Sequence, residues 1–199
     1  MQNLIDPTLA ENMTDVASEK QVDVLFTYME EKGQTFYDEV VTQLEHALQC
    51  AALAEKNNAS ATVITGALLH DIGHFVLDEH NADIAFLDID LNHEEVGAEY
   101  MSPFFPDAVI TPIRLHVPAK RYLCTVDDSY HDGLSEASKK SLKVQGGVMS
   151  NEEKTAFEAI PHYKDALTLR RWDDLAKVKG METQELETYR DIVQQCLNP

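Results

Sequence analysis

Hydrophobic residues recur along most of this chain with the period of an α-helix. Between residues 21 and 31 the apolar positions follow the spacing i, i+3, i+4 and i+7, at Val22, Leu25, Phe26 and Met29. Residues at this spacing share one face of a helix. The pattern therefore predicts an amphipathic helix whose apolar face packs against a core.

The same period predicts further helices. Ser60 is expected to cap one of them, and Ser150 opens the Ser-Asn-Glu-Glu pattern of a capping box. The expected ranges are 37–56, 61–77, 93–101, 107–120, a helix beginning at 135, one after 150, 163–177 and 183–197. Residues 78–92 are expected to form a loop and residues 1–15 a loose N-terminal arm. No convincing strand pattern interrupts the series. We predict a single all-α domain, a helical bundle, over residues 1–199.

The charge balance limits the partners. The chain has 16 Lys and Arg against 35 Asp and Glu, a formal net charge of −19, which disfavours nucleic acid and anionic membranes. No stretch has the length and apolar character of a membrane span or a signal peptide, so we expect a cytoplasmic protein. Cys50, Cys124 and Cys196 are odd in number and far apart, and we expect reduced thiols.

Candidate chemistry is concentrated at Leu68-Leu69-His70-Asp71-Ile72-Gly73-His74. On a continuous helix, His70 and His74 are i, i+4 neighbours on one face, and Asp71 lies beside them. Imidazole and carboxylate groups are suitable ligands for Fe, Mn or Zn, and one carboxylate can bridge two cations. A core histidine satisfied by its neighbours is the competing interpretation of such a segment.

Histidines elsewhere favour the metal site. His46, His93 and His116 lie on other predicted helices, and Asp173 follows Trp172 on a later one. Side chains that project inward from several helices of a bundle can build a metal site in its core. We therefore expect His46, His70, Asp71, His93, His116 and Asp173 to converge.

The order His, His-Asp, His, His, Asp resembles the HD-domain superfamily of helical metalloproteins, most of which are phosphohydrolases. Several segments resemble one branch specifically, the di-iron oxygenases that cleave C–P bonds of 1-hydroxyalkylphosphonates and are related to myo-inositol oxygenase. The segments are Gln43-Leu-Glu-His46, Leu69-His-Asp-Ile-Gly-His74, His93-Glu-Glu-Val-Gly-Ala98, His116-Val-Pro-Ala-Lys-Arg-Tyr-Leu123, Leu134-Ser-Glu-Ala-Ser138, Gln145-Gly-Gly147 and Arg170-Arg-Trp-Asp173.

The resemblance implies two iron ions, Fe(II) and Fe(III), with O2 as co-substrate. One ion would be held by His46, His70, Asp71 and Asp173, and the other by Asp71, His93 and His116. Asp71 would bridge them. The resemblance also assigns His74 and Lys120 to the reacting centre with Asp71, and assigns His74, Lys120, Ser138, Ser141 and Arg170 to the phosphonate. A phosphonate group is an anion, and cationic side chains and hydroxyl donors are suited to bind it.

The resemblance places recognition of the other end of the substrate, its amine, near residues 36–39. In the branch that oxidises 2-amino-1-hydroxyethylphosphonate, a Tyr-x-x-Glu segment recognises the amine. Here the glutamate is Glu39, but Phe36 occupies the tyrosine position, with Tyr37 and Asp38 beside it. Aromatic and acidic groups suit a quaternary ammonium, so we expect Tyr37, Asp38 and Glu39 to favour the N-trimethyl substrate, giving glycine betaine and phosphate, over the primary amine, giving glycine. These residues could instead begin a helix.

Two alternatives to the oxygenase remain. One is an HD phosphohydrolase that acts on a nucleotide or phosphoester with the same metal ligands. The other is a non-catalytic metal-binding module. We expect a small-molecule organophosphonate as the partner, and a monomer or weak homo-oligomer.

Overall fold

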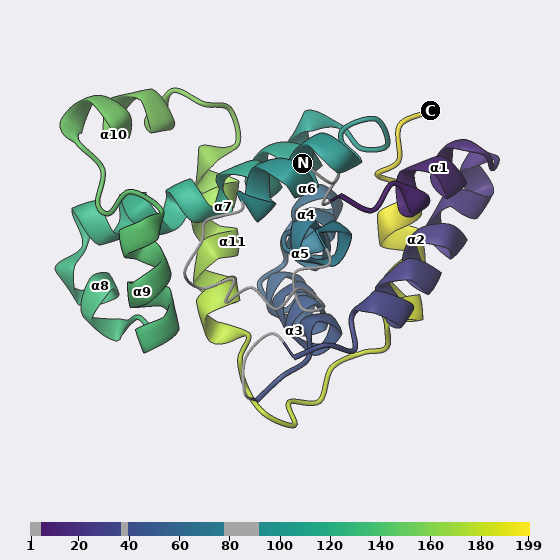
Figure 1. Ribbon diagram of the computed structural model, residues 1–199, viewed down its shortest axis with the longest axis horizontal. Coiled ribbons are helices and arrows are strands. Elements are labelled where there is room, and N and C mark those ends of the chain that lie inside the picture. The colour runs from purple at the N-terminus through teal and green to yellow at the C-terminus, as the bar shows by residue number, and fades with distance from the viewer. Residues whose placement is uncertain (1–4, 37–39, 78–91) are drawn as a thin grey trace.

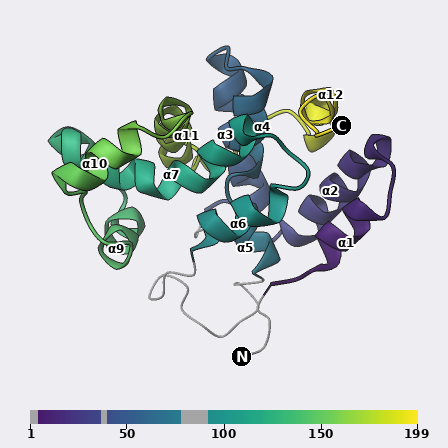
Figure 2. The same ribbon diagram turned by 90° about the horizontal axis from the view of Figure 1, so that it is seen from above.

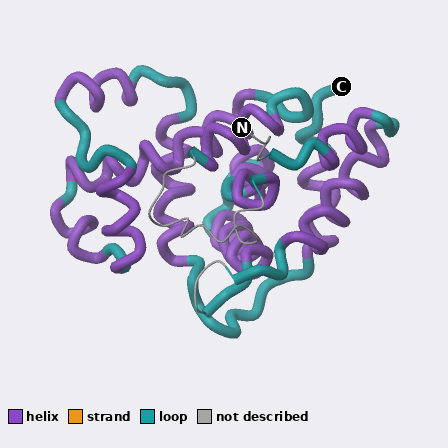
Figure 3. The backbone as a smooth tube through the Cα atoms, in the orientation of Figure 1, coloured by secondary structure: helices purple, strands orange, loops and turns teal. Residues whose placement is uncertain are grey.

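The computed structural model describes residues 5–36, 40–77 and 92–199, and these ranges are mainly helical (Figures 1 and 3). Extended pairing within them is an isolated bridge between Phe36 and Thr42. The prediction of an all-α fold is confirmed. None of the described helices is both long and apolar enough to cross a membrane.

Six helices form the central part of the fold. They are α3 (Gln43–Lys56), α4 (Ala61–Leu69), α5 (Ile72–Val76), α6 (His93–Met101), α7 (Asp107–Val126) and α11 (Tyr163–Leu175). The long helix α7 contacts α4, α6 and α11, and α3 contacts α4 and α11. Figure 2 shows these helices grouped around the centre of the molecule. Their facing apolar residues bury the main core, including Leu68, Ile110 and Leu169.

Further helices flank this centre on two sides (Figures 1 and 2). On one side lie α1 (Thr8–Thr14) and α2 (Ser18–Lys32), and α12 (Arg190–Gln194), preceded by the 3-10 helix η2 (Leu186–Tyr189), packs against α2 and α4. On the other side lie α8 (Asp128–Gly133), α9 (Glu136–Val144) and α10 (Asn151–Glu158). Two smaller apolar clusters hold this second group against α7 and α11.

The expectation of a loose N-terminal arm is wrong for residues 8–14. They form α1, whose Leu9 and Met13 are buried against α2. The two residues are one helical turn apart, so a single short apolar stripe is enough to attach the segment to the core. Tyr100 of α6 adds a hydrogen bond from its hydroxyl to the Asp6 carbonyl oxygen.

Two predicted boundaries are wrong at places that bear on the site. The helix expected from residue 37 begins only at Gln43, because Thr42 and Glu45 form a capping box. The helix expected over 61–77 is interrupted at His70 and Asp71, which separate α4 from α5. The Ser60 cap of α4 and the Ser150 capping box of α10 are confirmed.

Other differences are in helix length. Helix α7 continues to Val126 because Leu123 and Cys124 extend its buried face. Helix α8 was not expected, and residues 183–197 form only the short η2 and α12. The predicted helices over 21–31 and 93–101 are confirmed.

Candidate active site

The carboxylate of Asp71 lies at the centre of a ring of histidines. Its Oδ2 is 3.5 Å from Nε2 of His46 and 3.4 Å from Nε2 of His70. Its Oδ1 is 3.5 Å from Nε2 of His93 and 3.4 Å from Nε2 of His116. The two oxygens therefore face two different pairs of histidines.

These separations fit ligands of shared metal ions. Nitrogen and oxygen ligands lie about 2.0–2.2 Å from a metal such as zinc, so two ligands of one ion are about 3.0–3.5 Å apart. Asp173 completes the first group, since its Oδ1 is 3.4 Å from Nε2 of His46. In the second group, Nε2 of His93 and Nε2 of His116 are 3.0 Å apart.

Three buried atoms of the site accept no hydrogen bond from the residues that the structure describes. They are Nε2 of His70, Oδ2 of Asp71 and Oδ1 of Asp173. Their side chains are at most 5% exposed, and polar atoms buried in this way normally have a partner. Cations in the centre would satisfy all three atoms, so the residues present fit a metal site.

Backbone carbonyl groups fix the orientation of three histidines. Nδ1 of His46 lies 2.8 Å from the Ala176 carbonyl oxygen. The corresponding distances are 2.9 Å from His70 to Ala67 and 2.7 Å from His116 to Ile113. A carbonyl oxygen can only accept, so each Nδ1 carries the proton and each Nε2 presents a lone pair to the centre. This arrangement is typical of metal-binding histidines.

The local charges agree with that assignment. Burial alone would raise the pKa of Asp71, but His70 and His93 hold it well below its usual range. Burial would also raise the pKa of Asp173, and Arg170 and Lys177 hold it well below its usual range. Burial lowers the pKa of His116. Burial also lowers the pKa of His70, so two carboxylates and the neutral imidazoles of His70 and His116 face the centre.

The break between α4 and α5 explains how Asp71 reaches the centre. Because the helix is interrupted, the prediction that His70 and His74 project from one face of a continuous helix is wrong. His74 instead stacks on His93, with ring centroids 3.8 Å apart and an interplanar angle of 18°. It therefore lies beside the pair formed by His93 and His116.

Lys120 lies one turn after His116 on α7 and is 2% exposed. Its ammonium donates a hydrogen bond of 2.8 Å to the Ser141 hydroxyl, which in turn donates to the Ser138 carbonyl oxygen at 3.2 Å. The structure thus brings Lys120, Ser138 and Ser141 together between α7 and α9. Burial, followed by the charge of Arg170, lowers the pKa of Lys120 to about 7.

Arg170 is engaged with neighbouring acidic residues. It donates to Oδ2 of Asp173 at 2.7 Å and also pairs with Asp174. The geometry therefore places Arg170 behind Asp173, with a direct role in fixing that carboxylate. Tyr37, Asp38 and Glu39 lie outside the described residues.

Sequence reasoning missed several residues beside the centre. Cys50 is buried one turn after His46, with its Sγ 4.0 Å from Nε2 of His46. Lys177 follows Asp173 by four residues, and its Nζ is 3.8 Å from Oδ1 of Asp173. Both offsets of four residues are visible in the sequence. Gln49 connects α3 to the backbone of Val178, and no sequence signal identifies that pairing.

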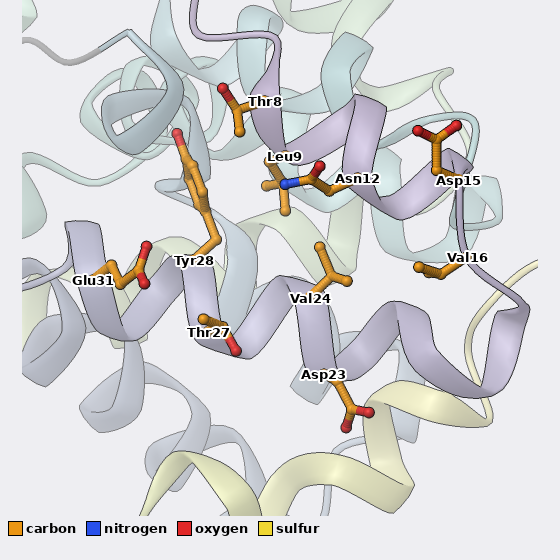
Figure 4. Close-up of a pocket in the computed structure, with 10 residues that line it drawn as sticks. All are labelled: Thr8, Leu9, Asn12, Asp15, Val16, Asp23, Val24, Thr27, Tyr28 and Glu31. Carbon is orange, nitrogen blue, oxygen red and sulfur yellow. The ribbon is translucent and has the colours of Figure 1, made fainter.

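A separate groove of about 410 Å³ lies between α1 and α2 (Figure 4). Its lining includes Asp15, Asp23 and Glu31 but none of the predicted site residues. Three carboxylates make it unsuitable for an anionic substrate, so the chemistry is assigned to the histidine centre.

Comparisons with known proteins agree with this site. The HD domain family model matches residues 44–157, more than half of the chain. The chain is 53% identical over 178 residues to a hydroxymethylphosphonate dioxygenase of Gimesia maris, covering 89% of each protein. It is 41% identical over 165 residues to a glycine-betaine-forming [1-hydroxy-2-(trimethylamino)ethyl]phosphonate dioxygenase of Leisingera caerulea, covering 83% of this chain and 84% of the relative.

A third relative is the uncharacterized protein L432 of Acanthamoeba polyphaga mimivirus, 35% identical over 177 residues and 88% of this chain. The two named relatives are dioxygenases, which agrees with a centre built from histidines and carboxylates that binds a metal and uses O2. The chain belongs to the HD-domain family and, within it, to the dioxygenases that act on phosphonates.

Proposed function

We propose that this chain uses O2 to cleave the C–P bond of a 1-hydroxyalkylphosphonate, releasing phosphate and a carboxylate. The observation that carries the proposal is the position of Asp71, whose two oxygens face separate histidine pairs. A carboxylate so placed is suited to bridge two cations. We assign His46, His70, Asp71 and Asp173 to one iron, and Asp71, His93 and His116 to the other.

The iron pair would supply the redox chemistry, by accepting electrons from the substrate and passing them to O2. The chain's own residues hold the site in place. The backbone contacts of His46, His70 and His116 fix their rings, and burial excludes bulk water from the centre.

Lys120 is the residue best placed to bind the phosphonate, with Ser138 and Ser141 beside it. Lys120 is buried and lies one turn from the proposed ligand His116 on the same helix. A cation there offsets the repulsion that a protein of net charge −19 exerts on a dianion. We propose that His74, stacked on His93, contacts the same substrate.

The substituent at C1 decides between related substrates. The names of the two relatives share a phosphonate with a hydroxyl group at C1 and differ in what else C1 carries. Oxidation of hydroxymethylphosphonate by one O2 would balance as formate, phosphate and one proton. The trimethylamino compound would give glycine betaine and phosphate, and the primary amine would give glycine and phosphate. Hydroxymethylphosphonate is the first substrate to test, because the relative that acts on it shares 53% of aligned residues.

The test is O2 consumption and phosphate release by the iron-loaded protein with each of the three phosphonates. We expect phosphate to appear only when O2 is present. One phosphate should be released for each O2 consumed. Phosphate release from a phosphonate or phosphoester without O2 would instead support the hydrolase alternative. Glu39→Ala tests the proposed amine contact: an unchanged KM for both aminophosphonates would contradict it.

A further inference from the structure

Asp173 is held by a buried arginine on its far side. Oδ1 of Asp173 faces His46, while Oδ2 accepts the 2.7 Å hydrogen bond from Arg170. Both residues are at most 4% exposed. The direction in which Asp173 presents Oδ1 therefore depends on where the Arg170 guanidinium lies.

Arg170 is in turn fixed by Tyr130 and Asp174, neither of which is among the proposed metal ligands. Its Nε donates to the Tyr130 hydroxyl at 3.2 Å and lies 3.3 Å from Oδ2 of Asp174, and its other terminal nitrogen pairs with Oδ1 of Asp174. The Tyr130 hydroxyl also donates to Asp174. Arg170, Asp174 and Tyr130 thus form a closed triangle.

Tyr130 enters this triangle from a different part of the fold. It belongs to α8, and its ring packs against the small apolar cluster of Cys124, Leu134 and Leu142. Its ring also carries the Arg171 guanidinium at 5.6 Å from the centroid. The α8 to α9 segment thereby fixes the hydroxyl group that Arg170 contacts.

We propose that Tyr130 and Asp174 are positioning residues that hold Arg170, and through it Asp173, in the orientation that binds metal. This inference rests on the proposed role of Asp173 as a ligand. Residues that orient a ligand from behind commonly change metal affinity by about 10–100-fold when they are replaced. A free arginine side chain has many rotamers, and the triangle selects the one that serves Asp173.

Burial makes the triangle sensitive to the loss of one member. Removing the Tyr130 hydroxyl withdraws a donor from Asp174 and an acceptor from Arg170, inside a region where burial raises the pKa of Tyr130. A buried charged group that loses a hydrogen-bond partner bears a desolvation cost, which closer contact with its remaining partners reduces. Arg170 then keeps Asp173 and Asp174 as its partners. Without the Tyr130 contact the guanidinium can turn toward Asp174, and that movement draws it away from Asp173.

The experiment compares Tyr130→Phe with Tyr122→Phe. Tyr122 also donates to a carboxylate, that of Glu158, at 2.7 Å. Among the described residues, Tyr122 and Glu158 form no hydrogen bond or ion pair with Arg170. Iron affinity is measured by competition with a chelator in the absence of phosphonate, and kcat and KM are measured separately. We expect Tyr130→Phe to weaken iron binding about 10-fold or more and to lower kcat with KM nearly unchanged, whereas Tyr122→Phe matches the wild type.

Asp174→Asn provides a second variant, expected to act in the same direction, and Asp174→Glu should restore part of the loss. Wild-type iron affinity in both Tyr130→Phe and Asp174→Asn would overturn the inference. A rise in KM alone would also overturn it, because Arg170 would then serve the phosphonate and not Asp173. If no phosphonate is oxidised but Tyr130→Phe still weakens iron binding, the proposed substrate fails and this inference stands.

Discussion

Gly73 lies so close to His93 that a methyl group at residue 73 would be 1.9 Å from the His93 carbonyl oxygen. The backbone of α5 and the first turn of α6 therefore meet directly. Gly97 supports the same contact, because a methyl group there would be 2.9 Å from the Gly73 nitrogen. This approach brings the proposed ligand His93 to Oδ1 of Asp71, whereas His46 faces Oδ2.

Replacing Gly73 by alanine is therefore expected to separate α5 from α6. Backbone atoms of His93 cannot yield as a flexible side chain would, so we expect the free energy of unfolding to fall by about 3 kcal/mol or more. Gly133→Ala is the control, since nothing lies within 4 Å of its added methyl group, and its effect should remain within about 1 kcal/mol. Denaturant unfolding checks both, and equal stability of the two variants would contradict the close contact.

Asp71→Asn tests the proposal that one carboxylate bridges two iron ions. The amide removes the charge that both histidine pairs face, so we expect iron affinity to fall by more than about 100-fold at both positions and turnover to be lost. Asp165→Asn is the matched control, because Asp165 pairs with His162 at 3.1 Å on the surface of α11. Elemental analysis after dialysis measures both proteins. Retention of one full equivalent of iron by Asp71→Asn would rule out the bridging role.

Much of the fold follows from local patterning, as α2 and α6 illustrate. Their apolar residues repeat with a helical period, and that repeat needs no knowledge of distant contacts. The interruption at His70 and Asp71 could not be found in this way, since the apolar run continues through Leu69 and Ile72 without a change of period. The segment after the break packs directly against His93, which is far from Gly73 in the sequence, and local patterning contains no signal for such a contact.

The site, like the fold, combines features that local sequence predicts with features that depend on distant contacts. Histidines next to acidic residues point to metal chemistry by composition alone, and His46, His70, Asp71, His93, His116 and Asp173 do converge in the structure. The supports behind them are tertiary. Arg170 could be noted as a cation, but its pairing with Asp173, Asp174 and Tyr130 depends on the docking of α8 against α11.

Gln49→Ala tests a tertiary contact that holds the segment after Asp173 against α3. The Gln49 side chain donates to the Val178 carbonyl oxygen at 2.9 Å and accepts from the Val178 nitrogen at 3.0 Å. Together with the contact between His46 and Ala176, this joins α3 to the segment after Asp173. Losing two partly buried hydrogen bonds should cost about 2 kcal/mol and weaken iron binding. Gln184→Ala is the control, because Gln184 makes an exposed hydrogen bond to Glu55. Equal thermal stability of the two variants would contradict this role.

The lowered pKa of Lys120 leads us to expect that substrate binding depends on pH. Burial and the nearby Arg170 lower its pKa to about 7, so the side chain is an ammonium group below pH 7 and loses its charge above it. A phosphonate prefers the charged form, and KM should therefore be flat below about pH 6 and rise above about pH 7, approaching tenfold per pH unit. The phosphonate's own ionisation contributes equally in a variant without the amine, so the difference from Lys120→Met isolates Lys120. Lys139→Met, which alters an exposed pair with Glu136, should keep the wild-type profile.

The pH dependence of the free energy of unfolding tests the lowered pKa of Lys120 a second time, without substrate. The unfolded chain holds the Lys120 proton up to its ordinary pKa of 10.5, whereas the folded protein releases it near 7. Between those values the unfolded state binds more protons, so the free energy of unfolding contributed by Lys120 rises with pH. Below about pH 7 the cost of burying the charge is fully present. We expect Lys120→Met to lack this rise, and a wild-type slope in the variant would show that the Lys120 pKa is not lowered in the folded protein.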